Sequence, residues 1–259
     1  MVEGNTVVVT GGAGGIGRST VRRLLADGYR VFAIDSDPRA LEALLGDLGG
    51  DGRLDGLCAD VTSEPQVEAA IGRAAAGPGT LYGLVHVAGG AGPKRSREIE
   101  GFSLAEWLHV IDLNLTSAFL ATRAVVPILR RRGGGRVVLF SSVIADGENG
   151  PLTTVTGRLP YATAKAALLG FTRQLAKDEA EAGITINALM PGLILGDQGT
   201  RIRDRFDRLT TDEKSLLLGG YPAGKPGSGD DIAAAVSYLL SHQAGFVSGI
   251  ALPVDGAYR

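Results

Sequence analysis

The sequence is poor in cysteine and has little excess charge of either sign. A single cysteine, Cys58, cannot form an internal disulfide, so we expect a reducing compartment, with Cys58 as a small core residue in a strand. With 26 Lys and Arg against 28 Asp and Glu, the net charge is −2. That balance gives no electrostatic reason to expect nucleic acid or an anionic membrane as a partner.

The sequence also lacks a leader and long apolar runs. Residues 1–4 pass almost at once into a strand-like run, without the basic segment and apolar stretch of a signal peptide. No apolar run approaches the ~20 residues that a membrane helix requires. We therefore expect a cytoplasmic protein that does not enter a membrane.

What the chain does contain is a regular alternation of short β-rich runs with helical stretches. The predicted strands are Thr6–Thr10, Arg30–Asp35, Leu54–Asp60, Leu81–Ala88, Arg136–Ser141, Thr185–Leu189 and Ile250–Val254. Most are nearly continuous apolar runs, which are typical of a parallel sheet covered on both faces. Alternation over residues 1–259, with no repeat or linker, predicts one doubly wound α/β domain of the Rossmann type.

Two helix starts are predicted from capping boxes. Ser63 with Gln66 opens a helix whose apolar face carries Val67, Ala70, Ile71 and Ala74. Ser228 with Asp231 offers a second start. The stretches 146–159 and 196–222 fit the alternation badly, and we expect them to be surface loops, where substrate specificity tends to lie.

A glycine-rich turn lies between the first predicted strand and the first predicted helix. The segment reads Thr10-Gly11-Gly12-Ala13-Gly14-Gly15-Ile16-Gly17. Glycine allows the backbone to turn tightly and to approach a pyrophosphate, and the helix N-terminus directs free N–H groups at the phosphates. A plain structural turn is the alternative, but the strand-turn-helix context favours dinucleotide binding.

Asp35 ends the second predicted strand, 18 residues after Gly17. An acid at about this distance binds the ribose hydroxyls of the adenosine, and it repels a 2′-phosphate. We therefore predict NAD(H) rather than NADP(H) as the cofactor. The alternative, that this aspartate caps the next helix, is weakened because Asp37 before Pro38 can provide that cap.

Tyr161 and Lys165 lie four residues apart at the start of a long predicted helix. This spacing places the phenol and the ammonium on one helix face. A free tyrosine has a pKa of about 10, and a nearby ammonium is expected to lower the pKa and so to make proton exchange with a substrate oxygen feasible. Taken alone, the pair is better explained as a surface tyrosine and lysine that happen to be four residues apart.

Ser141 and Ser142 close the fifth predicted strand. Ligands of an open parallel sheet bind beyond the carboxyl ends of its strands. A serine at this place can hydrogen-bond a substrate oxygen, although an isolated Ser-Ser is more often a turn or a helix cap.

Together these motifs resemble the short-chain dehydrogenase/reductase family over essentially the whole chain. The turn TGGAGGIG matches the TGxxxGxG pattern of the family, and YATAK matches YxxxK. The resemblance implies a seven-stranded parallel sheet and the catalytic residues Asn114, Ser142, Tyr161 and Lys165. In the family Tyr161 would be the acid or base, and Lys165 would lower its pKa and bind ribose. Ser142 would orient the substrate oxygen, and Asn114 would help to hold a water that links Lys165 to solvent.

The resemblance also implies a set of cofactor-binding residues, spread over the carboxyl ends of several strands. They are Gly11, Gly14, Gly15, Ile16, Gly17, Asp35, Asp60, Val61, Ala88, Gly89, Tyr161, Lys165, Pro191, Gly192 and Ile194. No metal ligand is among them. The partner implied is a small alcohol or ketone, and the chain is expected to form a homotetramer or a homodimer.

Three features of the sequence depart from the family pattern. His86 and Val87 stand where the family has two asparagines, and we expect His86 to be a buried, hydrogen-bonded core residue. The interval from Ser142 to Tyr161 is 19 positions, which is longer than usual. The threonine that commonly follows Pro-Gly is missing from the segment 193–197, which removes one contact expected for the nicotinamide carboxamide.

The sequence therefore predicts an NAD(H)-dependent oxidoreductase that transfers a hydride between a nicotinamide and a secondary alcohol or ketone. One alternative is a biosynthetic ketoreductase that works mainly in the reductive direction. The other is a dinucleotide-sensing regulator without chemistry, which the presence of both Tyr161 and Lys165 disfavours. No segment encodes a recognisable substrate.

Overall fold

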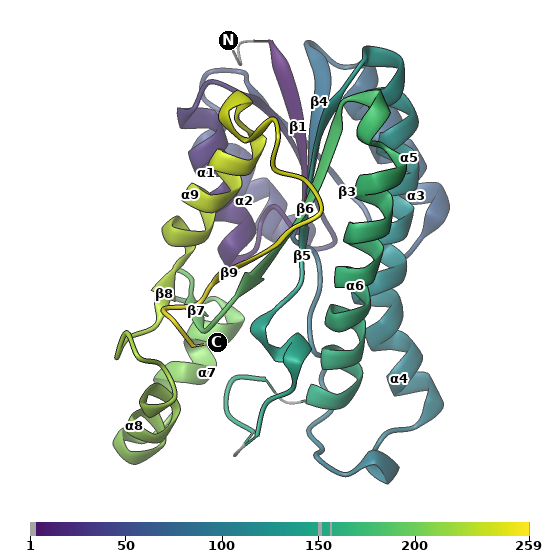
Figure 1. Ribbon diagram of the computed structural model, residues 1–259. Coiled ribbons are helices and arrows are strands. Elements are labelled where there is room, and N and C mark those ends of the chain that lie inside the picture. Colours follow the sequence, from purple (N-terminus) through teal and green to yellow (C-terminus); the bar gives the residue numbers. More distant parts are fainter. Residues whose placement is uncertain (1–3, 150–151, 156, 259) are drawn as a thin grey trace.

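The computed structural model describes residues 4–149, 152–155 and 157–258. Within these residues one parallel sheet of seven strands has the order β3-β2-β1-β4-β5-β6-β9, with helices on both faces (Figure 1). The strands are β1 (Asn5–Thr10), β2 (Arg30–Asp35), β3 (Leu54–Cys58), β4 (Thr80–His86), β5 (Gly135–Phe140), β6 (Ile184–Pro191) and β9 (Ala251–Val254). The predicted doubly wound α/β fold is confirmed.

The helices form two layers, one on each side of the sheet (Figure 1). One layer holds α1 (Gly15–Ala26), α2 (Pro38–Leu48) and α9 (Gly229–Leu240), and the other holds α3 (Glu64–Ala76), α5 (Ser117–Arg132) and α6 (Arg158–Asp178). Side chains alternate across each strand. Val8 therefore packs under α3 and α5, whereas Val7 and Val9 pack under α1 and α9. Both faces are buried, which explains the continuous apolar runs of the sequence.

The strand order reverses beside β1, which pairs with β2 on one side and with β4 on the other. The carboxyl ends of β1, β4, β5 and β6 consequently open into one crevice, where ligands of such sheets bind. The glycine turn follows β1, and Ser141 and Ser142 follow β5. The fold thus brings the separate sequence motifs to one edge.

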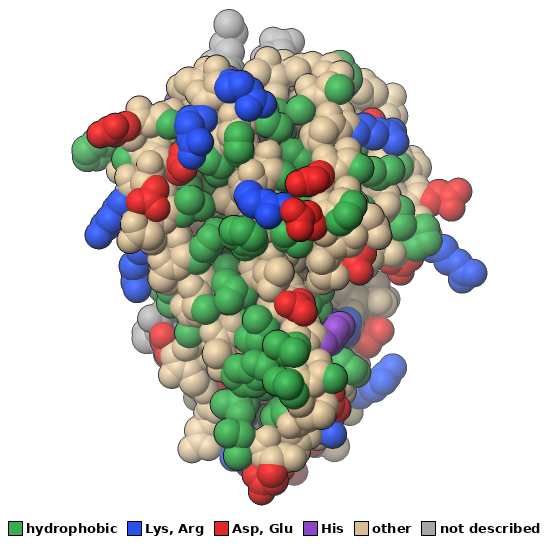
Figure 2. All heavy atoms as spheres, turned by 90° about the vertical axis from the view of Figure 1, so that its right-hand side faces the viewer, with side chains coloured by type: hydrophobic (Ala, Val, Ile, Leu, Met, Phe, Trp, Pro, Cys, Tyr) green, Lys and Arg blue, Asp and Glu red, His purple; other side chains and the backbone are tan. Residues whose placement is uncertain are grey.

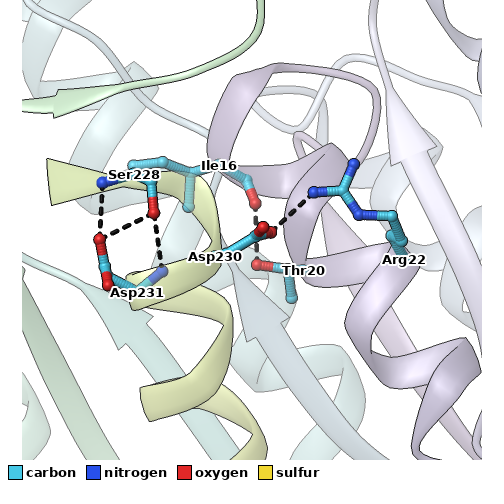
Figure 3. A network of polar contacts seen from close by, with 6 residues as sticks. All are labelled: Ile16, Thr20, Arg22, Ser228, Asp230 and Asp231. Atoms are coloured by element: carbon cyan, nitrogen blue, oxygen red, sulfur yellow. Dashed lines mark hydrogen bonds and ion pairs between the residues drawn. The ribbon is translucent and has the colours of Figure 1, made fainter.

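Helix α9 packs closely against α1, the helix that begins at the glycine turn. A Cβ at Gly229 would lie 2.3 Å from Ser19 Oγ, so the contact requires glycine. Figure 3 shows the Arg22–Asp230 ion pair, at 2.7 Å, that joins the two helices. It also shows the reciprocal hydrogen bonds between Ser228 and Asp231 at the start of α9, which confirm the predicted capping box.

Two local predictions were wrong. Gln66 does not complete a capping box with Ser63, because its Oε1 accepts a hydrogen bond from the Asp60 N–H, at 2.9 Å. Cys58 lies in a strand but is exposed. The reason is the strand order, since β3 is an edge strand of the sheet.

Residues Leu104–Arg132 form a nearly continuous helix that consists of α4 (Leu104–Ile111), a π-helical turn (Asp112–Thr116) and α5. By length and composition alone this helix could cross a membrane, although the sequence analysis found no such run. Its side chains at Ala118, Val125 and Leu129 are fully buried in the core beside the sheet. One face of α5 is therefore packed against the core of the fold, whereas Leu104, Leu108 and Phe119 of the same helix are exposed.

The described parts of the two irregular stretches lie at the crevice end of the sheet. In the first stretch they are residues 146–149, 152–155 and 157–159, between a 3₁₀ turn (Val143–Asp146) and the start of α6, and residues 150, 151 and 156 lie outside the described residues. Residues 196–222 contain α7 (Arg201–Asp207) and α8 (Thr211–Gly219). A two-residue strand, β7 (Ile194–Leu195), pairs with β8 (Gly227–Ser228) and anchors the second stretch.

Candidate active site

The glycine turn after β1 contains glycines that the chain itself requires. Gly11 has φ +64°, and a Cβ there would lie 2.9 Å from the Ala88 nitrogen. A Cβ at Gly17 would lie 1.9 Å from the Gly11 carbonyl oxygen. These two positions allow the turn to close beneath α1 and to pack against residue 88 after β4.

Gly14 and Gly15 have a different environment. A Cβ at Gly14 would meet only the Gly11 oxygen, at 3.7 Å, and one at Gly15 would have no neighbour closer than 3.5 Å. The described chain does not need glycine there for its own packing. Among the described residues, no side chain caps the start of α1 at Gly14. An open surface beside helix N–H groups fits the pyrophosphate of a dinucleotide.

Asp35 ends β2 beside this turn. Its Oδ2 accepts a hydrogen bond from the Ala13 N–H at 3.0 Å, and its Oδ1 accepts one from the Asp37 N–H at 3.1 Å. Asp37 itself caps α2 through the Arg39 and Ala40 N–H groups. The carboxylate of Asp35 is therefore not the helix cap but a brace between the glycine turn and the strand end.

Asp60 and Val61 follow β3 at the same edge of the sheet. Asp60 Oδ1 accepts hydrogen bonds from the Thr62 N–H and hydroxyl, and Val61 is buried. Pro191 is the last residue of β6 and Gly192 follows it, and Ile194 lies in β7 with its side chain buried. The structure places all of these sequence-predicted residues along the crevice edge.

Ser142, Tyr161 and Lys165 converge at the end of β5. The hydroxyl of Ser142 hydrogen-bonds the phenol of Tyr161. Lys165 is buried, and its Nζ lies 5.5 Å from the centre of the Tyr161 ring. Ser141 instead donates to the Lys165 carbonyl oxygen, at 2.7 Å. Of the two serines, Ser142 is therefore the one that contacts the phenol.

The electrostatics differ from the sequence prediction. Burial raises the pKa of Tyr161 above its ordinary value, while the Ser142 hydrogen bond and the charge of Arg201 lower it. Burial also lowers the pKa of Lys165 to about 7. The pKa of Tyr161 is thus raised overall, and the groups that oppose this rise are Ser142 and Arg201. A buried amine holds its proton weakly.

Asn114 lies in the π-helical turn and is fully buried. Its side chain accepts from the Gly90 N–H at 3.0 Å and donates to the Gly90 and Val110 carbonyls, each at 2.8 Å. A Cβ at Gly89 would lie 2.6 Å from Asn114 Oδ1 and 3.1 Å from Lys165 Nζ. Asn114 thus holds the segment after β4 against Lys165.

His86, at the end of β4, is a buried core residue, as expected. Its Nδ1 lies 2.9 Å from Thr10 Oγ1, and its Nε2 lies 3.0 Å from Ser117 Oγ. Burial and the charge of Lys165 lower its pKa to about 3. The neutral imidazole therefore bridges β1 and α5 where the family pattern has asparagine.

A cavity joins these residues to both irregular stretches. Its lining includes Ser142, Tyr161 and Lys165. Further lining comes from residues that sequence analysis did not single out, which are Glu148, Thr154, Arg201, Ile202 and Tyr221. No motif marks them, because they reach the site only through the folding of segments distant in sequence.

The chain matches known proteins along most of its length. The family model described as short chain dehydrogenase matches residues 5–206. The chain is 32% identical to the 3-oxoacyl-[acyl-carrier-protein] reductase FabG of Escherichia coli (strain K12), with 98% of this chain and 97% of that protein covered. It is 33% identical to 2-(S)-hydroxypropyl-CoM dehydrogenase 3 of Xanthobacter autotrophicus, with coverage of 98% and 96%.

A solved structure, that of levodione reductase, superposes with a TM-score of 0.87 at 30% identity and covers 99% of this chain and 98% of that one. The fold and the crevice define a dinucleotide-binding oxidoreductase that acts on alcohols or ketones. This chain belongs to the short-chain dehydrogenase family.

Proposed function

We propose that this protein transfers a hydride between NAD(H) and a secondary alcohol or ketone. The observation that carries the proposal is the convergence of Ser142, Tyr161 and Lys165 at the end of β5, in the cavity that also contains Gly89 and Gly192. The exposed backbone at Gly14, the residue before α1, supports binding of the dinucleotide beside it.

The three side chains have different proposed roles toward the substrate and the cofactor. A bound nicotinamide would donate or accept the hydride. Tyr161 gives a proton to the substrate oxygen or takes one from it, and Ser142 hydrogen-bonds the same oxygen and orients it. Lys165 would bind the ribose next to the nicotinamide, and Asn114 positions the segment 89–90 beside Lys165 and is proposed to hold a water there.

NAD(H) rather than NADP(H) is proposed as the cofactor because Asp35 places a carboxylate beside the glycine turn. A carboxylate accepts hydrogen bonds from the ribose diol and repels a 2′-phosphate. The adenine would lie near Asp60 and Val61. The proposed contacts near the nicotinamide are Ala88, Gly89, Pro191, Gly192 and Ile194.

The stretches 146–159 and 196–222 are proposed to form the substrate side of one catalytic domain. Glu148 and Thr154 come from the first, and Arg201 and Tyr221 come from the second. The ends of the first stretch are tied by the Glu148–Arg158 ion pair, at 2.6 Å. A deletion between these two residues should change kcat/KM for substrate far more than NADH affinity, and unchanged kinetics would contradict this role.

A ketoreductase that works mainly in the reductive direction is the second candidate. The Escherichia coli relative and levodione reductase are both named as reductases. The same site performs either direction, because Tyr161 donates the proton in reduction and accepts it in oxidation.

The test is absorbance at the nicotinamide band during reaction with a panel of secondary alcohols plus NAD⁺ and of the matching ketones plus NADH. Turnover with either set supports the proposal, and the faster direction decides between the two candidates. NADH binding without turnover on any member of either panel would favour the dinucleotide sensor.

We also propose a cytoplasmic homo-oligomer, either a dimer or a tetramer. Figure 2 shows hydrophobic side chains gathered on the face that carries α4 and α5. Leu104, Leu108 and Phe119 are exposed there, and such patches mark association surfaces. Sedimentation equilibrium should give two or four chains per particle, and a monomer would contradict the proposal.

A further inference from the structure

Three arginine side chains converge where the two irregular stretches meet the cavity. Arg201 and Arg205 lie four residues apart on α7, and Arg95 comes from the segment after β4. The charges of Arg201 and Arg95 act together with burial to lower the pKa of Arg205. Because like charges repel, such a cluster is unfavourable unless an anion lies among its members.

Two of these arginines hold the loop that faces the substrate side. Arg205 Nη1 donates to the Thr154 carbonyl at 3.0 Å, and Arg95 Nη2 donates to the Leu152 carbonyl at 2.6 Å. Thr154 itself lines the cavity that contains Tyr161. The two guanidinium groups are thereby fixed to the same short segment, at carbonyls two residues apart.

Arg201 connects the cluster to the reacting groups. It lines the same cavity as Ser142, and its charge lowers the pKa of Tyr161. A Cβ at Gly90 would lie 2.8 Å from Arg201 Nη2, so a glycine at residue 90 leaves room for the guanidinium. The guanidinium of Arg201 therefore borders the cavity beside Gly90, although the residue as a whole is exposed to solvent.

The cluster is only partly neutralised by the described chain. Over residues 4–149, 152–155 and 157–258, no carboxylate forms an ion pair with the three arginines, although the charge of Arg95 acts on the Glu213 carboxylate at the start of α8 and lowers its pKa. Glu148, a carboxylate that lines the cavity, is paired with Arg158. On the same helix as Arg201 and Arg205, Arg203 has a partner, Asp207, at 2.8 Å. The charges of Arg201 and Arg205 are thus left for a ligand.

We propose that Arg95, Arg201 and Arg205 bind an anionic group of the substrate, so that the enzyme acts on alcohols or ketones that carry a carboxylate, sulfonate or phosphate. Guanidinium groups suit this role because their planar forks pair with the oxygens of such groups. The inference rests on the proposed function, and it adds the substrate class to it.

The first test uses 3-oxobutanoate, 3-oxopentanoate and 3-oxohexanoate, each beside its methyl ester, with NADH as reductant. The acid-to-ester ratio of kcat/KM should be at least about tenfold for one chain length, and it should fall about tenfold in Arg201→Gln and in Arg205→Gln. Arg203→Gln is the matched control and should keep the ratio. Arg205→Lys should keep part of it, because the charge remains while the fork is lost. A ratio near one at every length in the wild type would overturn the inference.

The second test does not need turnover. With NADH saturating, sodium sulfate should raise the thermal midpoint of the wild type above that in sodium chloride of equal ionic strength. The triple variant Arg95→Gln, Arg201→Gln, Arg205→Gln should lose this difference. A sulfate effect without turnover of any alcohol or ketone would support the anion site and contradict the proposed function.

Two other outcomes would overturn the anion site and leave the proposed function intact. Turnover with an acid-to-ester ratio of kcat/KM near one, and without an effect of sulfate on the thermal midpoint, would support the proposed function and contradict the anion site. Weaker NADH binding in the variants, with an unchanged acid-to-ester ratio, would assign the arginines to the cofactor phosphates.

Discussion

The ammonium nitrogen of Lys165 lies 2.7 Å from the carbonyl oxygen of Phe140 and donates a hydrogen bond to it. Phe140 is the last residue of β5 and Lys165 lies in α6, so this bond ties the strand that leads to Ser142 to the helix that carries Tyr161. Lys165 therefore has a structural role in the site as well as its proposed role toward the ribose.

Replacing Lys165 with methionine removes both roles while keeping an unbranched side chain of similar length. We expect kcat to fall by about 10²-fold, because loss of the tie between β5 and α6 misplaces Ser142 and Tyr161 relative to each other, and we expect the Kd for NADH to rise. Stopped-flow reduction and NADH fluorescence measure the two quantities. Unchanged NADH affinity would contradict the proposed ribose contact.

Tyr161→Phe removes the phenol hydroxyl and keeps the ring. Because Lys165 keeps its hydrogen bond to the Phe140 carbonyl, folding and NADH binding should persist, while kcat falls by at least ~10²-fold. Circular dichroism and NADH titration are the controls for folding and binding. A variant with near-normal turnover would mean that another group moves the proton.

The pH dependence of alcohol oxidation tests the influence of Arg201 on Tyr161. Oxidation needs the ionised phenol, so its rate should rise with pH through the pKa of Tyr161. Since the charge of Arg201 lowers that pKa, Arg201→Gln should move the rise to higher pH. A neutral alcohol is the substrate for this measurement, and Arg203→Gln should leave the profile in place.

Cofactor preference should depend on Asp35, but not through charge alone. Asp35→Ala combined with Ser36→Arg removes the repulsion of a 2′-phosphate and adds a partner for it, which should raise the NADPH-to-NADH ratio of kcat/KM. Removal of the carboxylate also leaves the Ala13 N–H without its acceptor. Both cofactors should therefore bind less tightly to this variant than the change in charge alone would predict. Asp35→Asn, which keeps one acceptor oxygen, is the control. A wild type that already prefers NADPH would contradict the assignment.

His86 should make the fold sensitive to acid. Its pKa is lowered to about 3 in the folded chain, whereas in the unfolded chain it is about 6.5. As the pH falls below about 6.5, His86 becomes protonated in the unfolded chain but stays neutral in the folded chain, so the free energy of unfolding falls. From pH 7.5 to pH 5 this contributes a loss of about 2 kcal/mol.

His86→Asn should remove this part of the pH dependence. Urea unfolding of both proteins at pH 7.5 and pH 5 measures it, because the carboxylates titrate in both and cancel. Equal losses of stability in the two proteins would contradict the buried, neutral state of His86.

The predicted strands agree with the structure because each is a short apolar run bounded by glycine or by charged residues. β2 was predicted at its observed bounds, Arg30–Asp35. Cys58 was predicted as buried because its strand is apolar, and it is exposed because β3 lies at the sheet edge. Strand order depends on contacts between distant segments, which local sequence does not contain.

Within the site, the sequence by itself determined the features that depend only on residues close together in the chain. The glycine turn and the Tyr161–Lys165 pair are each set within a few residues, by backbone sterics and by the helical repeat. Only the tertiary structure decided the environment of these groups. Burial lowers the pKa of Lys165 to about 7. The approach of Arg95 to Arg205 across more than a hundred residues creates the positive cluster. Desolvation and charge act through space, so they depend on which distant segments the fold brings together.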